Sequence, residues 1–163
     1  MMHLNKILFF LFLLNAFILI LSCSNEKGFF DPTYWNKGFQ GITFTDELGE
    51  IIREDPDDWK YRTDTEGFPK YAAIYPAYPN PVSLGKGIYF QFQLPKRANV
   101  KLVIVNDNYN TLRVLCDGPH LAGFYSVMWD LKDDREWLML KGVYRCLFFV
   151  NENQISYGDI WIK

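Results

Sequence analysis

Histidine and cysteine, the side chains that most often carry catalysis or bind metals, are scarce in this sequence. Among its 163 residues it has two histidines, His3 and His120, and three cysteines. It contains no Gly-x-Ser-x-Gly motif, no metal-ligand spacing and no glycine-rich phosphate loop. The sequence therefore predicts a protein that is not an enzyme and that needs no cofactor.

Clustered positive charge is missing as well. Lysine and arginine together number 17, aspartate and glutamate number 19, and both signs are scattered along the chain. A surface that binds nucleic acid needs a basic patch or stripe to neutralise phosphates. We therefore expect no nucleic-acid partner, and we read the mildly acidic balance only as an aid to solubility.

Helical patterns rich in alanine, glutamate and leucine are nearly absent, whereas aromatic side chains are abundant. The chain has 14 Phe, 10 Tyr and 5 Trp, and 49% of its residues are hydrophobic. A chain of this size can build one core without disulfides or metals, and aromatic and β-branched residues favour strands. We therefore expect one all-β domain with a short N-terminal extension.

The N-terminal region has the pattern of an export signal. Lys6 precedes an apolar run from residue 7 to residue 21 that only Asn15 interrupts. A helix needs roughly 20 apolar residues to cross a bilayer. This shorter run is therefore typical of the core of a signal peptide rather than of a permanent span.

The next segment, Leu21-Ser22-Cys23-Ser24, resembles a bacterial lipobox, in which a small residue directly precedes a cysteine. The resemblance implies that residues 1–22 are a lipoprotein signal peptide and that Cys23 is lipidated. More than one acyl chain there would hold the protein stably at a membrane. Ser24 differs from the Asp of inner-membrane retention signals, which favours the outer membrane of the cell envelope. An ordinary secretory signal and an uncleaved anchor are the alternatives.

Residues 23–70 are predicted to form a tether and a small extension. Apolar stretches at 42–44 and 50–52 flank a four-residue connection that ends in Gly49. Glycine late in a short connection is typical of a hairpin turn, because it adopts positive φ at little cost. We therefore expect a hairpin in this extension.

A short helical turn is predicted directly after the hairpin. Asp55 is a good N-cap residue, Pro56 suits the first helical position, and acidic residues follow. We expect Trp59 to dock this turn. The clustered carboxylates also suggest calcium, with a solvated helix start as the alternative; they belong to Asp55, Asp57 and Asp58.

Residues 71–163 have the pattern of an antiparallel sandwich. Apolar residues alternate with Tyr89, Gln91 and Gln93 over residues 88–94, which predicts a half-buried strand. Turn signals, including Asp117-Gly118, separate further strands at intervals of about 8 to 14 residues. We expect these strands at residues 100–105, 111–116, 123–130, 142–150 and 154–163. The pattern therefore predicts a β-sandwich of about seven strands, for which the resemblance described next implies an Ig-like (fibronectin III-like) fold.

An ordered set of motifs between residues 75 and 163 carries a family resemblance. The motifs are Tyr78-Pro79-Asn80-Pro81, Leu94-Pro95, the apolar strand at 100–105, Trp129-Asp130 and Gly142-Val143-Tyr144. Together they resemble the Ig-like domain of the flagellar hook-capping protein and the C-terminal domains that sort cargo through the bacterial type IX secretion system. Leu131 and Arg135 depart from the family pattern in the loop after Trp129. The resemblance implies an Ig-like fold with Trp129 in its core.

Two cysteines, Cys116 and Cys146, follow Cys23 in the chain. An exported protein occupies a compartment in which disulfides persist, so pairing is one interpretation. Cys116 falls at the end of an expected strand and Cys146 in the middle of another, and nothing in the sequence brings their Cα atoms within bonding range. We therefore favour two buried free thiols.

Two sets of residues are candidates for ligand contacts. Trp35, Trp59 and Trp137 could stack on sugar rings, although aromatic residues of small β-proteins more often pack beneath a sheet. The carboxylates of Asp130, Asp133 and Asp134 could bind calcium at one end of the sandwich, with a solvated turn as the alternative.

Three functional hypotheses follow. The first is a cell-envelope lipoprotein whose sandwich is a structural or interaction module for a protein or glycan partner. The second is a type IX sorting domain behind a short cargo, and the third is a carbohydrate-binding surface protein. The lipobox and the brevity of the segment before the sandwich favour the first.

Overall fold

The computed structural model describes residues 39, 41–59 and 69–163 of this chain. It divides into two units, Met1–Trp35 and Asn36–Lys163, and all the described residues belong to the second. These residues contain nine strands and no helix, and hence no helix long and apolar enough to cross a membrane. The predictions for the signal peptide and for Cys23 concern residues outside the described ones.

The extension contains the predicted hairpin. β1 (Phe44–Thr45) pairs antiparallel with β2 (Ile51–Arg53), one or two residues from the expected positions. The connection forms because the side chain of Asp46 accepts hydrogen bonds from the backbone N–H groups of Leu48 and Glu50, while Gly49 takes a φ of 89°. Positive φ at this position explains why the turn uses glycine.

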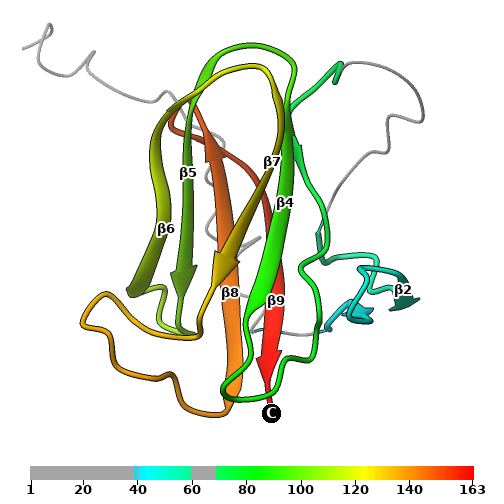
Figure 1. Ribbon diagram of the computed structural model, residues 1–163, viewed down its shortest axis with the longest axis vertical. Coiled ribbons are helices and arrows are strands. Elements are labelled where there is room, and N and C mark those ends of the chain that lie inside the picture. The colour runs from blue at the N-terminus through cyan, green and yellow to red at the C-terminus, as the bar shows by residue number, and fades with distance from the viewer. Residues whose placement is uncertain (1–38, 40, 60–68) are drawn as a thin grey trace, which may run out of the picture. The chain divides into compact units, whose positions relative to one another are not determined.

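The other seven strands form two antiparallel sheets (Figure 1). The three-stranded sheet has the order β3-β4-β7, and the four-stranded sheet has the order β6-β5-β8-β9. Their bounds are β3 (Ala73–Ile74), β4 (Ile88–Leu94), β5 (Ala98–Val105), β6 (Thr111–His120), β7 (Gly123–Trp129), β8 (Gly142–Val150) and β9 (Asn153–Ile162).

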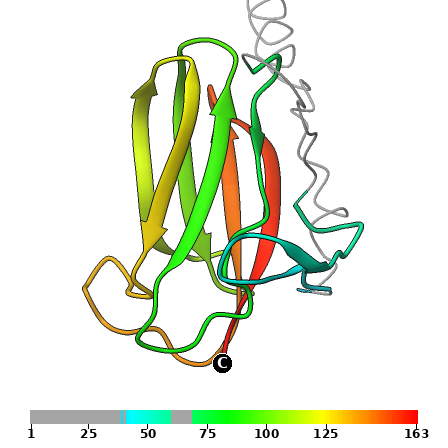
Figure 2. The ribbon, with the colours of Figure 1, turned by 45° about the vertical axis from the view of Figure 1, so that its right-hand side comes forward.

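The two sheets enclose one hydrophobic core and lie as facing layers (Figure 2). The alternation in β4 has the predicted sense at Ile88, Phe90 and Phe92, which are buried, and at Tyr89 and Gln91, which are exposed. Gln93, expected on the outer face, is buried, and its carboxamide donates to the carbonyl of Tyr71 at 3.1 Å. Phe92 packs against Phe148 of the opposite sheet with ring centroids 5.4 Å apart. Trp129 is also buried in this core, and its Nε1 donates to the carbonyl of Lys132 at 2.7 Å.

β6 continues through the expected turn at Asp117-Gly118, so that prediction was wrong. Gly118 adopts a φ of 146°, which glycine accepts at little cost, and pairs with Val100 of β5. Pro119 is tolerated because β6 is the edge of its sheet, where the missing N–H costs no ladder bond. The chain therefore turns only after His120.

The outer edge of β9 is closed by side chains and by short backbone segments rather than by another long strand. The carboxamide of Asn80 accepts a hydrogen bond from the N–H of Trp161 at 3.0 Å and donates to the carbonyls of Asp159 (2.8 Å) and Thr43 (3.0 Å). The N–H of Val82 donates to the carbonyl of Trp161 at 2.9 Å. The Tyr78-Pro79-Asn80-Pro81 motif thus joins β9 to the extension.

Residues 55–59 form a turn and not the predicted helical turn. The side chain of Asp55 accepts a hydrogen bond from the N–H of Asp57, and Trp59 has a φ of 47°, which ends the turn and directs its indole inward. Trp59 is only 1% exposed and packs on Phe90, so its predicted role in docking this segment is confirmed.

Trp59 lies directly on the backbone of β9 at Gly158. The N–H of Trp59 donates to the carbonyl of Tyr157 at 2.9 Å. A Cβ atom added at Gly158 would lie 1.9 Å from Cε2 of the indole, closer than any real contact. Gly158 is therefore required by the close approach of the indole.

A buried ion pair lies beside this contact. Arg145 on β8 donates to both carboxylate oxygens of Asp159 on β9, at 2.6 and 2.8 Å. The guanidinium also donates to the hydroxyl of Tyr109 at 3.0 Å and lies over the ring of Tyr157, 4.3 Å from its centroid. Burial by itself lowers the pKa of Arg145, but its hydrogen bonds to Asp159 raise it overall, so the guanidinium stays charged.

Asp58 completes the buried polar cluster. Its carboxyl accepts hydrogen bonds from the N–H groups of Thr43 (2.9 Å) and Asp159 (2.7 Å). These bonds favour the ionised form, but desolvation by burial outweighs them and raises the pKa of Asp58 from 3.8 to about 7. The charge of Asp159 acts in the same direction.

Both described cysteines are free, as predicted. Cys116 on β6 is paired with Leu102 and Cys146 on β8 with Ile104, so β5 lies between them. Two strand spacings amount to roughly 10 Å, beyond the reach of a disulfide. Burial raises the pKa of the Cys116 thiol to about 11.

Gly158→Ala should destabilise the protein, because the added methyl group overlaps the indole of Trp59. Overpacking of this kind costs about 1–3 kcal/mol, and denaturant unfolding measures the loss. In a Trp59→Ala background the same substitution should cost much less, since the clash is gone. Equal losses in the two backgrounds would contradict the close approach.

Stability should fall as pH rises from about 4 to about 7. The folded state holds the Asp58 proton to about pH 7 whereas the unfolded chain releases it near 3.8, so the benefit is complete below that value and is lost as the folded group ionises. Each pKa unit corresponds to about 1.4 kcal/mol. Asp58→Asn should flatten this slope in urea unfolding series, while Asp57→Asn, a change at an exposed carboxylate on the same turn, should not.

Candidate functional site

The loop that joins β7 to β8, residues 131–140, is held by a tight polar frame, and we call it the Trp137 loop. The side chain of Asp133 accepts hydrogen bonds from the N–H groups of Arg135 and Trp137, both at 2.9 Å. The N–H of Asp133 donates in return to the carbonyl of Trp137, and Glu136 takes a φ of 64°. A side-chain acceptor at the first position and a left-handed residue at the fourth close this turn.

The same turn occurs three times in the described residues. Asp46 and Asn106 make the hydrogen bonds that Asp133 makes, each to the N–H groups two and four residues later. The left-handed position is held by Gly49, Tyr109 (φ 58°) and Glu136. The sequence indicates the first of these turns through Gly49 and the second through the Asn and Asp residues at 106–110, whereas it predicts the third only as a solvated turn.

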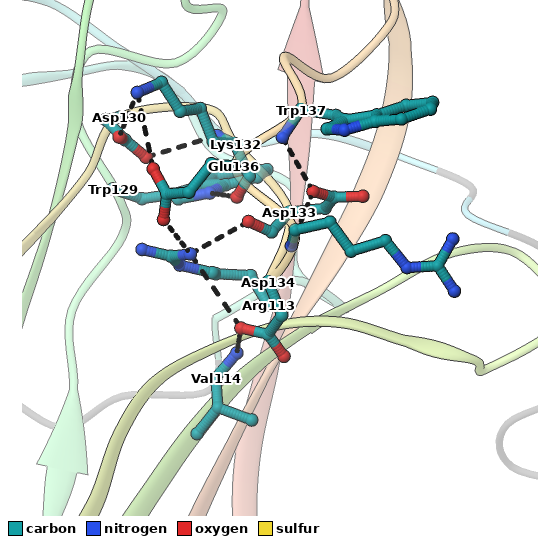
Figure 3. Close-up of polar contacts among 10 residues, drawn as sticks. Arg113, Val114, Trp129, Asp130, Lys132, Asp133, Asp134, Glu136 and Trp137 are labelled. Atoms are coloured by element: carbon teal, nitrogen blue, oxygen red, sulfur yellow. Dashed lines mark hydrogen bonds and ion pairs between the residues drawn. The ribbon is translucent and has the colours of Figure 1, made fainter.

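Arg113 of β6 fastens the Trp137 loop to the sheet (Figure 3). Its guanidinium donates to the carbonyl of Asp133 at 2.8 Å and to the carboxylate of Glu136 at 2.9 Å. Hydrogen bonds from Arg113 and then from Lys132 hold the pKa of Glu136 below its usual value. Asp134 adds a backbone bond to Leu112 at 2.9 Å. The loop is therefore built on the edge of β6.

The outer side of this loop carries exposed apolar side chains. Trp137 is 72% exposed, Leu138 53% and Leu140 79%, and the indole points away from the polar cluster (Figure 3). Met139 between them packs against the core instead. Three large apolar side chains exposed in one loop make this loop a candidate binding surface.

The carboxylates named as candidates for calcium, Asp130, Asp133 and Asp134, make hydrogen bonds to the backbone of this loop and of β6. Asp130 accepts from the N–H of Lys132 at 3.2 Å and lies 3.5 Å from its ammonium. Asp134 accepts from the N–H of Val114, and Asp133 closes the turn described above. No group of three or more His, Cys, Asp or Glu in the part of the chain that the structure describes could hold a metal ion, and this includes Asp55, Asp57 and Asp58.

The three tryptophans proposed to stack on ligands have different positions. Trp59 is buried in the core, so its assignment as an exposed stacking residue was wrong. The reason is its left-handed φ, which turns the indole towards Phe90, and no sequence signal indicates it. Trp137 is exposed as the hypothesis requires, and Trp35 lies outside the described residues.

A second surface, which the sequence analysis missed, lies on β7. This strand pairs with β4 alone among the described strands, and it carries no charged residue and no proline. Phe124 is 63% exposed and Met128 52% exposed on its outer face. Alternating apolar residues on both faces of an edge strand are the signal that could have indicated it.

The other three sheet edges are protected. The outer edge of β9 is bonded by Asn80, Val82 and Trp59, as described above. β6 has bulges and is bonded by Asp134, and β3 is only two residues long. Bulges, short strands and covering segments are the usual means of preventing edge pairing. Among the described residues, β7 is therefore the edge of the two sandwich sheets that is open to another strand.

No protein-family model matches this chain, and no curated protein matches it. Three solved structures are similar to parts of it. The alkylpurine DNA glycosylase AlkC of Pseudomonas fluorescens, bound to DNA containing an abasic site analog, is 17% identical over 56% of this chain and 30% of that chain, with a TM-score of 0.39. A candidate lipoprotein of Bacillus anthracis is 9% identical over 66% and 88%, with a TM-score of 0.37.

The third is the β-glucosidase of Listeria innocua in complex with isofagomine, 9% identical over 81% of this chain and 22% of that chain, with a TM-score of 0.41. This chain therefore spans less than a third of the glycosylase and about a fifth of the glucosidase. At TM-scores below 0.5, none of these similarities bears on the function of this chain.

Asp133→Ala should loosen the Trp137 loop, because two backbone N–H groups lose their acceptor. Each lost hydrogen bond is worth about 1 kcal/mol, so amide hydrogen exchange at Arg135 and Trp137 should accelerate several-fold. Asp133→Asn is the matched control, since Asn106 fills the same role in its own turn. Equal exchange in all three proteins would contradict the role of this side chain.

Proposed function

We propose that this chain is a cell-envelope lipoprotein, anchored through Cys23 in the outer membrane, whose sandwich is a non-catalytic module that binds a protein partner. The lipobox resemblance supports the anchor. Scarcity of histidine and of nucleophile motifs supports the non-catalytic role. The exposed, uncharged edge of β7 is the main observation in favour of a protein partner.

We propose further that the sandwich is Ig-like, of the fibronectin III kind. Counted from β3, the first, second and fifth strands form one sheet, and the fourth, third, sixth and seventh form the other. A division into a three-stranded and a four-stranded antiparallel sheet supports this class. The core position of Trp129 also agrees with what the family resemblance implies.

The edge of β7 suits the addition of an extended strand from the partner. In strand addition, main-chain hydrogen bonds give affinity, and alternate side chains that enter apolar contacts give specificity. Phe124 and Met128 lie two register positions on either side of Ser126, and they are cross-strand partners of Gln93 and Tyr89 on β4. A partner strand with apolar residues at matching positions would cover both.

A photoreactive residue in place of Phe124 should form a crosslink to one discrete protein in the native envelope. The same residue in place of Ile52, which is similarly exposed on β2, should give none. Ser126→Lys should abolish the crosslink, because a charge on an edge strand opposes pairing, whereas Ser126→Thr should preserve it. A crosslink that survives Ser126→Lys would contradict strand addition at β7.

The intact mass of the protein from its native envelope should correspond to a chain from acylated Cys23 to Lys163. An unmodified Cys23 would contradict the anchor. A product that lacks the region from about residue 75 onward would instead indicate that the sandwich is a sorting domain, removed after transport through the type IX system.

A further inference from the structure

We propose that the Trp137 loop docks onto the surface of the bilayer that holds the lipid anchor, with Trp137, Leu138 and Leu140 inserted at the level of the headgroups. This inference rests on the anchor proposed above and adds a second, protein-borne membrane contact. It concerns a different surface from the edge of β7.

The chemistry of the exposed side chains matches a lipid interface. Tryptophan is enriched where headgroups meet acyl chains, because its ring is apolar and its N–H is polar. Met139, which packs against the core, lies between Leu138 and Leu140, and both leucines are exposed. Three exposed apolar side chains thus fall within four consecutive residues of one loop.

The hydrogen bonds of the loop favour insertion, because its backbone is already ordered before it meets the membrane. Asp133 fixes the backbone on both sides of Trp137, Arg113 ties the loop to β6, and the N–H of Met139 donates to the carbonyl of Leu131 at 2.8 Å. A contact surface that is ordered in advance pays less entropy on binding.

The charges around the patch are compatible with anionic headgroups. Asp133, Asp134 and Glu136 are engaged by backbone N–H groups or by Arg113 and Lys132. Arg135 and Lys141, which lie on either side of the apolar residues in sequence, are exposed and have no ion pair within the described segments. Basic residues near a bilayer are attracted to its anionic lipids.

The tether is long enough for this contact. Phe39, the first described residue, follows Cys23 by 16 residues. A fully extended chain spans at most roughly 3.3–3.6 Å for each residue, so the sandwich can lie anywhere within about 55 Å of the anchor. An end loop of a domain of this size is within reach of the membrane surface.

Depth-dependent fluorescence quenching tests the proposal on the acylated full-length mature protein, reconstituted into vesicles that contain anionic lipids. All measurements use a Trp35→Phe background, which removes the tryptophan that follows Cys23 by 12 residues. In that background, phospholipids brominated near the headgroup should quench tryptophan emission, and Trp137→Phe should remove at least half of the quenching. Trp161→Phe should remove little, since Trp161 lies on β9 against Phe44. Trp59 and Trp129 are buried and contribute little to either measurement.

The combined variant Leu138→Asn and Leu140→Asn should reduce the quenching of Trp137 at least two-fold without affecting thermal unfolding. Leu48→Asn is the matched control, because Leu48 is 85% exposed in a turn of the same kind. It should leave the quenching unchanged.

Two outcomes separate this proposal from the anchor. Acylated protein whose Trp137 is not quenched would overturn the docking alone, whereas a mass that shows no acyl group on Cys23 would overturn the anchor and the docking together. A change of Trp137 emission on addition of soluble oligosaccharides, in acylated protein that brominated lipids do not quench, would overturn the proposal in favour of a glycan-binding loop.

Discussion

The hydrogen bonds that close the outer edge of β9 are the constraint on which the rest of the structure depends. β9 is the last strand of its sheet and exposes backbone groups that water or another strand would otherwise satisfy. Asn80 and Asp58 supply these bonds although they precede their partners on β9 by 79 to 101 residues. Because the same two side chains also bind Thr43, they join the extension to the sandwich.

This closure concentrates polar groups in an apolar interior. Arg145, Asp159 and Asp58 are all buried, and a buried ion pair contributes little net stability once desolvation is counted. Its effect is geometric, because the fork of the guanidinium fixes Asp159 while Asp58 binds the N–H of the same residue. Docking of the extension is thereby coupled to protonation of one carboxyl.

Because the edge of β9 is closed, strand pairing with another chain is left to a different edge of the described sheets. Of the edges described here, β9, β6 and β3 are covered, bulged or short, and β7 is uncharged and unprotected. The open edge and the Trp137 loop belong to different segments, so a sheet edge and a loop can serve different partners. The strand order of the two sheets sets the positions of both surfaces, the edge of β7 and the Trp137 loop.

Local patterns predicted the local parts of this structure. Alternation over residues 88–94 gave β4 its buried face, and Gly49 marked the hairpin. The segment from Asp55 to Trp59 was misread as helical because its local composition suits a helix start, while its conformation depends on Gly158, about a hundred residues later. Whether the edge of β7 is exposed depends likewise on how the other strands pair. The sequence of β7 alone therefore does not predict it.

The repeated turn has a consequence for how such a protein can change. In each copy the side chain of the first residue accepts two backbone hydrogen bonds and the fourth residue is left-handed. The fourth position holds a glycine, a tyrosine bonded to Arg145 of β8, or a glutamate bonded to Arg113 of β6. Substitution at the fourth position can therefore change which residues a loop contacts while its backbone path stays the same. In this way the loops of this sandwich can diversify while the strands that carry them keep their register.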